Sequence, residues 1–230
     1  MKPTRKDACA QLLSLAVHEF RTPASVVSGY LRMLQRDEAA PLNERHRKMV
    51  EEAEKSCARL VALVAEMSEV SKFDAGQTTL GKAPLDLFAV VQELANALSE
   101  SQERDVRFEV TGETCGAAML GDAARLESAC SAVFRAILRE QPAACTVIAD
   151  RRIHTPDGVR TAVIVVAEES ALHAVSASKP APFDEKRGGL GLALPLARRI
   201  IEGHGGRLWS PATAAERGAA IVSIPLGAER

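Results

Sequence analysis

His18 is the residue whose neighbours most clearly suggest chemistry, because Glu19 is adjacent and Thr22 follows one helical turn later on the same face. Neutral imidazole is nucleophilic at physiological pH. Pro23 removes the amide hydrogen that would bond the carbonyl of Glu19, which favours a helix kink just after the histidine. Residue types and spacing also allow a solvated helix histidine beside a tolerated proline.

A glycine run, Gly189-Leu190-Gly191-Leu192, is the second candidate site. Glycines at the start of a helix let backbone amides approach an anion, and the helix dipole favours negative charge there. The same run also suits a purely steric turn from a strand into a helix.

The elements that must position His18 follow from hydrophobic spacing in the first third of the chain. Apolar residues recur there at alternating intervals of four and three, which is typical of the seam of a coiled coil or helix bundle. These positions are Leu13, Val17, Phe20, Ala24, Val27, Leu31 and Leu34. His18 is one residue beyond the seam, at the edge of the apolar stripe, where a partner could reach it.

A second helix is predicted after the break at Pro41, with Asn43 as its N-cap. The same spacing returns at Leu42, His46, Met49, Ala53, Ser56, Leu60, Leu63, Met67 and Val70. Two helices of about 30 residues cannot cover both stripes by folding on each other, and heptad spacing favours a four-helix bundle. We therefore expect residues 1–78 to form a helical hairpin that builds a homodimer.

Composition limits the classes of partner and compartment. Lys plus Arg (29) nearly cancel Asp plus Glu (30), so the overall charge does not favour binding to nucleic acid or to an anionic membrane. The five cysteines include no C-x-x-C pair, which fits reduced thiols rather than disulfides or a zinc site. No apolar stretch reaches the roughly 18 to 20 residues that span a bilayer. We expect a cytoplasmic chain with no membrane span and no metal-ligating cluster.

Residues 14–34, SLAVHEFRTPASVVSGYLRML, resemble the H-box of the two-component sensor histidine kinases. Its core reads H-E-x-R-T-P on the first helix of a dimerisation and phosphotransfer hairpin. The resemblance implies that His18 accepts a phosphoryl group on an imidazole nitrogen, that Glu19 acts as general base or orients the ring, and that Thr22 positions water for dephosphorylation. It also implies a response-regulator receiver domain as partner.

The rest of the chain, residues 79–230, resembles the ATP-binding domain of the same family, an α/β sandwich in which helices back a mixed sheet. Gly189 and Gly191 match its second glycine box and would approach the nucleotide phosphates. The predicted elements are helices over 85–100 and 121–140, the second capped by Asp122, strands over 105–113, 145–150, 159–167 and 218–226, and a turn over 151–158. A further helix is expected after the glycine box within 187–209, with its C-terminus at His204 and with Trp209 packing in a strand. The expected fold class is α+β, with the hairpin followed by this domain.

Several positions depart from the nucleotide site of the family. Ala136 stands where the family has the asparagine that coordinates magnesium, and a methyl group cannot ligate a metal. Glu140 or Gln141 would have to substitute. Glu168 stands at the aspartate that holds adenine, and Ser170 replaces a glycine of the same box. The resemblance implies ATP and magnesium as cofactors, whereas these departures predict that magnesium-ATP binding is weak or absent.

The connection from His173 to Arg187 is also shorter and richer in proline and alanine than a typical nucleotide lid. Three functions therefore compete. The first is a protein phosphorylated on His18 that exchanges phosphate with receiver domains and has a degenerate ATP site. The second is an ATP-dependent sensor histidine kinase with a diverged metal site. The third is a non-enzymatic dimeric scaffold that modulates a kinase or regulator.

Overall fold

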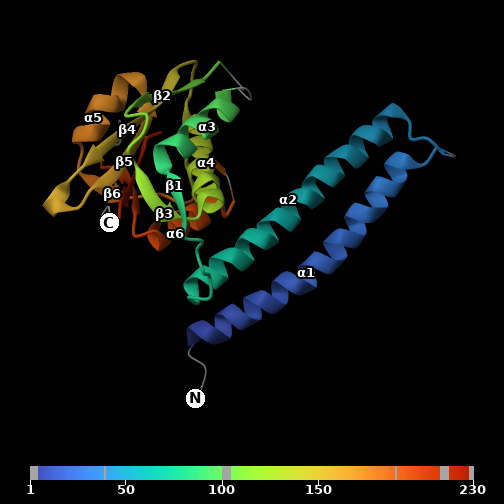
Figure 1. The fold of residues 1–230 in the computed structure, drawn as a ribbon. Helices are drawn as coiled ribbons and strands as arrows, with labels where there is room; N and C mark the ends of the chain where they lie inside the picture. The colour runs from blue at the N-terminus through green and yellow to red at the C-terminus, as the bar shows by residue number, and fades with distance from the viewer. Residues whose placement is uncertain (1–4, 39, 100–104, 190, 213–217, 228–230) are drawn as a thin grey trace. The chain divides into compact units, whose positions relative to one another are not determined.

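A computed structural model of the chain describes residues 5–38, 40–99, 105–189, 191–212 and 218–227. For a few of these, including His18, it describes the backbone alone. The chain divides into two compact units, Met1–Thr78 and Thr79–Arg230. The first is a helical hairpin and the second is built around a sheet (Figure 1).

The hairpin consists of α1 (Arg5–Arg36) and α2 (Glu44–Asp74). The predicted N-cap of α2 is confirmed, because the Asn43 side chain accepts a hydrogen bond of 2.9 Å from the backbone amide of His46. Pro23 lies inside α1, which continues on both sides of it. In the described part of the chain, no helix combines the length and apolar character that a bilayer span requires.

The predicted seam of α1 divides between two faces of that helix. One set of residues is buried or half-buried, and it comprises Val17, Ala24 and Leu31. The alternate set is 48% to 60% exposed, and it comprises Phe20, Val27 and Leu34. Only the first set therefore packs within the hairpin, and the second set leaves an apolar face open.

On α2 the covered residues lie one position after those of the predicted seam. Cys57 is buried and Val61 is half-buried, whereas Ser56 and Leu60 are exposed. One residue corresponds to a rotation of about 100° around a helix, so the two sets lie on different faces. The predicted α2 seam therefore describes an exposed face over this stretch, not the contact with α1.

The second unit contains a six-stranded sheet in the order β2-β4-β5-β8-β7-β6 and a separate pair, β1-β3. Only β2 and β4 are parallel neighbours; the other pairs are antiparallel. The strands are β1 (Ala83–Asp86), β2 (Arg107–Gly112), β3 (Ala118–Gly121), β4 (Thr146–His154), β5 (Thr161–Glu168), β6 (Pro180–Pro182), β7 (Arg207–Pro211) and β8 (Ala220–Pro225). The helices are α3 (Leu87–Ser99), α4 (Ala123–Glu140), α5 (Leu172–Ala177) and α6 (Ala193–Gly203), with 3-10 turns η1 (Pro156–Gly158), η2 (Glu169–Ala171) and η3 (Arg187–Gly189).

Helices cover both faces of the six-stranded sheet. In β5, Ile164 and Val166 alternate with Val165 and Ala167, and all four are buried, so both faces of this strand are covered. Val165 and Ala167 pack in one cluster with Val175 of α5. Figure 1 shows α3, α4 and α6 on the other side of the sheet from α5.

The predicted helices and strands of this unit are present, with two corrections. Residues 151–154 belong to β4 and not to a turn, because pairing with β5 continues as far as His154 opposite Thr161. Leu85 and Asp86 belong to β1, so α3 begins at Leu87. The prediction also missed β3, α5 and β6, which are six residues or shorter.

Candidate functional site

The first candidate site lies on α1. The backbone of His18 is helical, and its side chain lies outside the described part of the structure. Val17, one residue earlier, is buried against α2, whereas the side chains of Glu19 and Thr22 are exposed. Since Thr22 follows His18 by four residues in a continuous helix, both residues lie on one face. The structure therefore brings His18 and Thr22 together at an accessible edge of the hairpin.

A strip of exposed apolar residues runs beside His18 on α1, whereas Ser25, Arg32 and Arg36 lie closer to the direction of His18 itself. Leu15, Val26 and Met33 lie three residues before, eight after and fifteen after His18, which places them within about 80° of its direction. Their exposures are 59%, 52% and 67%. Exposed apolar side chains that share one face with a reactive residue type are characteristic of a binding surface.

The second candidate site is the nucleotide-like region of the second unit. Ala136, at the position of the metal-binding asparagine of the family, is fully buried in α4, and Ala132 one turn earlier is 9% exposed. Neither methyl group carries an atom that could ligate a metal, and that of Ala136 does not reach solvent. The methyl groups serve the packing of α4 against the rest of the core.

The two residues that could replace the missing metal ligand are engaged elsewhere. Both carboxylate oxygens of Glu140 accept hydrogen bonds of 3.0 Å from Nε of Arg187. The buried Gln141 side chain donates from Nε2 to the carbonyl oxygens of Ile137 and Gly218, at 3.0 and 3.2 Å. Arg187 was not singled out from the sequence, because its partner is 47 positions away and no periodic pattern links the two.

Two of the remaining predicted nucleotide contacts lie in exposed backbone. Gly189 and Gly191 precede α6 and have φ angles of +60° and +67°, which glycine adopts without strain. Leu190 between them lies outside the described residues. The half-buried Glu168 ends β5, and its carboxylate accepts a hydrogen bond of 3.1 Å from the hydroxyl of Ser170 in η2.

None of the three positions Ala136, Glu140 and Gln141 offers magnesium an oxygen ligand on a free side chain. Magnesium prefers oxygen ligands in octahedral geometry, and of the three residues considered, Ala136 has no such atom while Glu140 and Gln141 are held by internal partners. Among the described residues no group of three or more His, Cys, Asp and Glu side chains is arranged to hold a metal ion.

Comparison with known proteins places the first candidate site in a family. Residues 10–76 match the His Kinase A (phospho-acceptor) domain, and this range contains His18. The chain is 24% identical over 235 residues to the circadian input-output histidine kinase CikA of Synechococcus elongatus. The match covers 95% of this chain and 30% of that protein, so the chain spans less than a third of this relative.

Solved structures show the same fold. Full-length ShkA in complex with AMPPNP matches 94% of this chain and 45% of its own, with a TM-score of 0.65 and 20% identity. Histidine kinase ThkA in complex with response regulator protein TrrA matches 94% of this chain and 61% of its own, with a TM-score of 0.56 and 16% identity. Residues 10–76 therefore match the phospho-acceptor domain of histidine kinases, and over most of its length the chain is similar to two-component histidine kinases.

Proposed function

We propose that the chain is a histidine phosphotransfer protein of two-component signalling that exchanges phosphate with response-regulator receiver domains and does not use magnesium-ATP. One contrast carries the proposal. The phospho-acceptor domain retains His18, Glu19 and Thr22 together on α1. In the nucleotide-like domain, by contrast, Ala136 is buried and has no atom that binds a metal. Glu140, which could have replaced it as a metal ligand, is bonded to Arg187.

The proposed reaction moves a phosphoryl group between an aspartate and His18. The unprotonated imidazole nitrogen attacks the phosphorus of an aspartyl phosphate, the bond from phosphorus to the carboxylate oxygen breaks, and the aspartate leaves as a carboxylate. The other ring nitrogen then carries a proton that Glu19 accepts or orients. The reverse reaction returns the phosphoryl group to a receiver domain. Thr22, one turn away, would hold the water that hydrolyses the phosphohistidine.

The partner surface we propose is the face of α1 that joins His18 to the apolar strip beside it, formed by Leu15, Val26 and Met33. A receiver domain that covers this face would bring its aspartate to the histidine. The ThkA structure is a complex with the response regulator protein TrrA, which supports this class of partner for a chain of the same fold.

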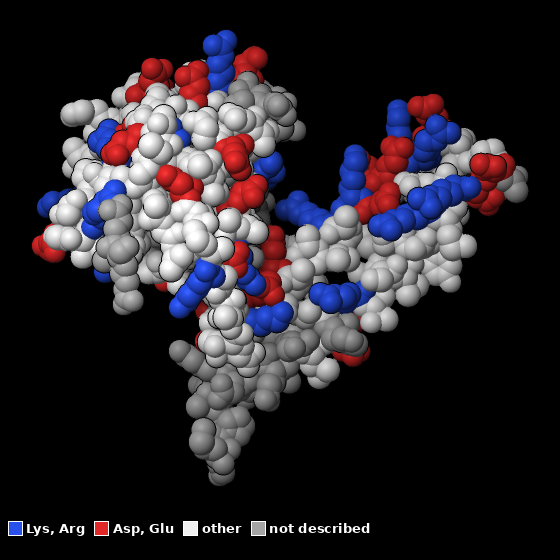
Figure 2. All heavy atoms as spheres, viewed as in Figure 1, with Lys and Arg blue, Asp and Glu red and all other residues white. Residues whose placement is uncertain are grey.

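The hairpin would dimerise through the second open face of α1 and the exposed seam of α2. Phe20, Val27 and Leu34 on α1 and Met49 and Leu60 on α2 are all about half exposed or more. Burying such side chains contributes about 25 cal/mol per Å² of apolar surface. Figure 2 shows that charged residues gather on α2 and near the loop, while much of the visible surface of α1 carries none.

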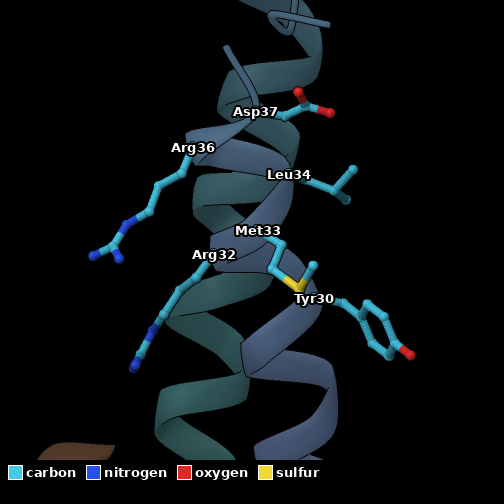
Figure 3. A pocket seen from close by; sticks show the side chains of 6 residues that line it. All are labelled: Tyr30, Arg32, Met33, Leu34, Arg36 and Asp37. Carbon is cyan, nitrogen blue, oxygen red and sulfur yellow. The ribbon is translucent and has the colours of Figure 1, made fainter. Parts of the chain in front are cut away.

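The C-terminal end of α1 adds to this open apolar surface. Tyr30, Met33 and Leu34 line an open hollow of about 450 Å³, together with Arg32, Arg36 and Asp37. In Figure 3, Tyr30 and Leu34 point to one side of the helix and Arg32 and Arg36 to the other. The apolar side of the hollow continues along α1 to the exposed side chain of Val27. We propose that a second copy of the hairpin covers this surface.

The test is transfer of radiolabelled phosphate from a phosphorylated receiver domain to the purified chain, with acid-labile label as the signal. We expect His18→Gln to abolish uptake. His154→Gln is the control, because His154 is an exposed histidine in the second unit, and it should take up label at the wild-type rate.

A parallel reaction with γ-labelled magnesium-ATP separates the alternatives. Label from ATP that depends on His18 would make the chain an ATP-dependent kinase. The scaffold function would remain if a folded dimer took up label from neither donor and if its effect on a partner protein survived His18→Gln.

A further inference from the structure

The segment between β5 and α6, residues 169–189, wraps around one edge of the six-stranded sheet; it is called the strap below. It begins on the sheet face opposite α3, α4 and α6 (Figure 1). There the Val175 side chain of α5 is fully buried in a cluster with Val165, Ala167 and Ile221. The first part of the strap is therefore part of the core on that face.

The middle of the strap forms the edge strand of the sheet. As β6, it pairs antiparallel with β7, with Ala181 opposite Ser210 and Pro182 opposite Trp209. The amide of Ala212 extends the pairing by donating a 3.1 Å hydrogen bond to the carbonyl oxygen of Lys179. Prolines are tolerated in β6 because an edge strand has one side without a neighbour.

The end of the strap returns to the face that carries α4, where Arg187 anchors it. The Arg187 side chain is only 8% exposed and forms a bidentate ion pair with Glu140 of α4. Its Nη1 also donates hydrogen bonds of 3.0 Å to Oγ of Ser210 and to the carbonyl oxygen of Ala219. The guanidinium carbon lies 5.1 Å from the ring centroid of Phe183, within the range of a cation-π contact.

A second and more exposed ion pair ties the same stretch of the strap to α6. Glu185 pairs with Arg198, whose side chain is 37% exposed. An exposed ion pair contributes little to stability, whereas removal of one partner from a buried pair leaves an uncompensated charge. Substituting Arg187 and Arg198 in turn therefore compares the effect of a buried arginine with that of a more exposed one on the stability of the strap.

We infer that the strap is a fixed part of the second unit, closed by Arg187 and not by a bound nucleotide, so that it does not act as a mobile lid. Opening it would expose Val175, separate β6 from β7 and leave Glu140 without its partner. This inference deepens the proposed function, because it states how the nucleotide-like site is closed in a chain that does not use magnesium-ATP.

The test is hydrogen exchange of the strap amides in the full chain, with and without magnesium and AMPPNP. We expect the same slow exchange in both conditions. Arg187→Met, which keeps the length of the side chain but removes its charge and donors, should speed exchange about tenfold or more in η3 and at the amide of Ala212, which donates to Lys179 of the strap. Arg198→Met is the matched control and should change exchange by less than about threefold.

Two results would overturn the inference: slower strap exchange when nucleotide is added to the wild type, or equal exchange in the two arginine variants. Glu140→Gln, which removes the opposite charge but keeps an acceptor, provides a second route if Arg187→Met does not fold, and it should also speed strap exchange. A nucleotide titration by calorimetry separates the two proposals. Nucleotide binding with unchanged strap exchange contradicts the loss of the nucleotide site and supports the fixed strap.

Discussion

The thiol of Cys57 on α2 donates a hydrogen bond of 3.1 Å to the carbonyl oxygen of Ala24 on α1. Cys57 is 5% exposed and, with Val17, is one of the most covered apolar side chains described in the hairpin. A small side chain at this point lets the two helices approach closely, two residues beyond Thr22. The contact therefore sets the position of the helix that carries His18.

We predict that Cys57→Ala lowers the free energy of unfolding by about 1 to 2 kcal/mol, because it removes a buried sulfur atom and its hydrogen bond. Urea denaturation of the full chain, followed by circular dichroism, measures the change. Cys115→Ala is the control, since Cys115 is exposed in the second unit and should have little effect. Equal effects of the two substitutions would contradict a role for Cys57 in the helix contact.

The predicted seam positions of α1 and α2 show how much of the hairpin could be predicted from the sequence. Heptad spacing correctly predicted two helices and an apolar face on each. It could not tell which apolar positions face the neighbouring helix, because covered and exposed apolar residues are adjacent in α2, as at Leu60 and Val61. A one-residue shift rotates the contact by about 100°, and only packing between the two helices selects one of the alternatives.

The strap shows a different limit. Its three-residue strand contains two prolines, and its helix has six residues, so neither has the length that a periodic pattern requires. Both are selected by contacts with β7 and β5, which are distant in sequence. The alanine at position 136 was visible in the sequence, whereas the engagement of Glu140 by Arg187 depends on tertiary structure alone.

Two alanines on α2 test the proposed dimer face. Ala53 and Ala62 are both exposed, and their separation of nine residues places them about 180° apart around the helix. Ala53 belongs to the predicted seam and lies on the side of Leu60. We predict that Ala53→Glu gives a monomer and that Ala62→Glu leaves the dimer intact, because only the first places a charge in the buried interface.

Light scattering of the eluting protein measures the mass of each alanine variant. Circular dichroism establishes that both remain helical. A dimeric Ala53→Glu variant, or loss of the dimer with Ala62→Glu alone, would place the interface on another face of the hairpin.

Asp122 gives the second unit a predictable response to acid. Its carboxylate accepts hydrogen bonds from the amides of Gly81, at 3.1 Å, and Arg125, at 3.2 Å. The bond from Gly81, followed by that from Arg125 and the nearby positive charge, lowers the pKa of Asp122. Because the folded pKa is lower than the unfolded one, the stabilisation is present above the ordinary aspartate range of about 3.9 and is lost as the pH falls through the folded pKa.

We predict that Asp122→Asn destabilises the second unit at neutral pH and that its difference from wild type shrinks on acidification. Asparagine keeps the side-chain acceptor that caps α4, so the comparison isolates the charge. Urea denaturation over a series of acidic pH values measures it. Asp157→Asn, at an exposed turn position, is the control. A difference that stays constant across the series would show that the charge of Asp122 does not contribute.

Alanine substitutions at Gly112 and Gly158 distinguish the cost of backbone strain from the cost of a steric collision in the second unit. Their φ angles are +81° and +80°, so an alanine at either position suffers the same strain. A Cβ atom at Gly112 would lie 2.1 Å from the carbonyl oxygen of Arg151, whereas one at Gly158 would meet no atom within 4 Å. Arg151 cannot easily yield, because its buried side chain donates hydrogen bonds to the carbonyl oxygens of Phe88 and Thr111, at 3.0 and 3.3 Å.

We predict that Gly158→Ala lowers the free energy of unfolding by about 1 to 2 kcal/mol, the cost of a left-handed residue with a Cβ atom. Gly112→Ala should cost at least about 2 kcal/mol more, because β2 must also move away from β4 to relieve the collision. Thermal and urea denaturation of the two variants measure the difference. Equal losses would mean that β2 shifts freely at its C-terminal end, and that Arg151 does not hold β4 rigidly against α3.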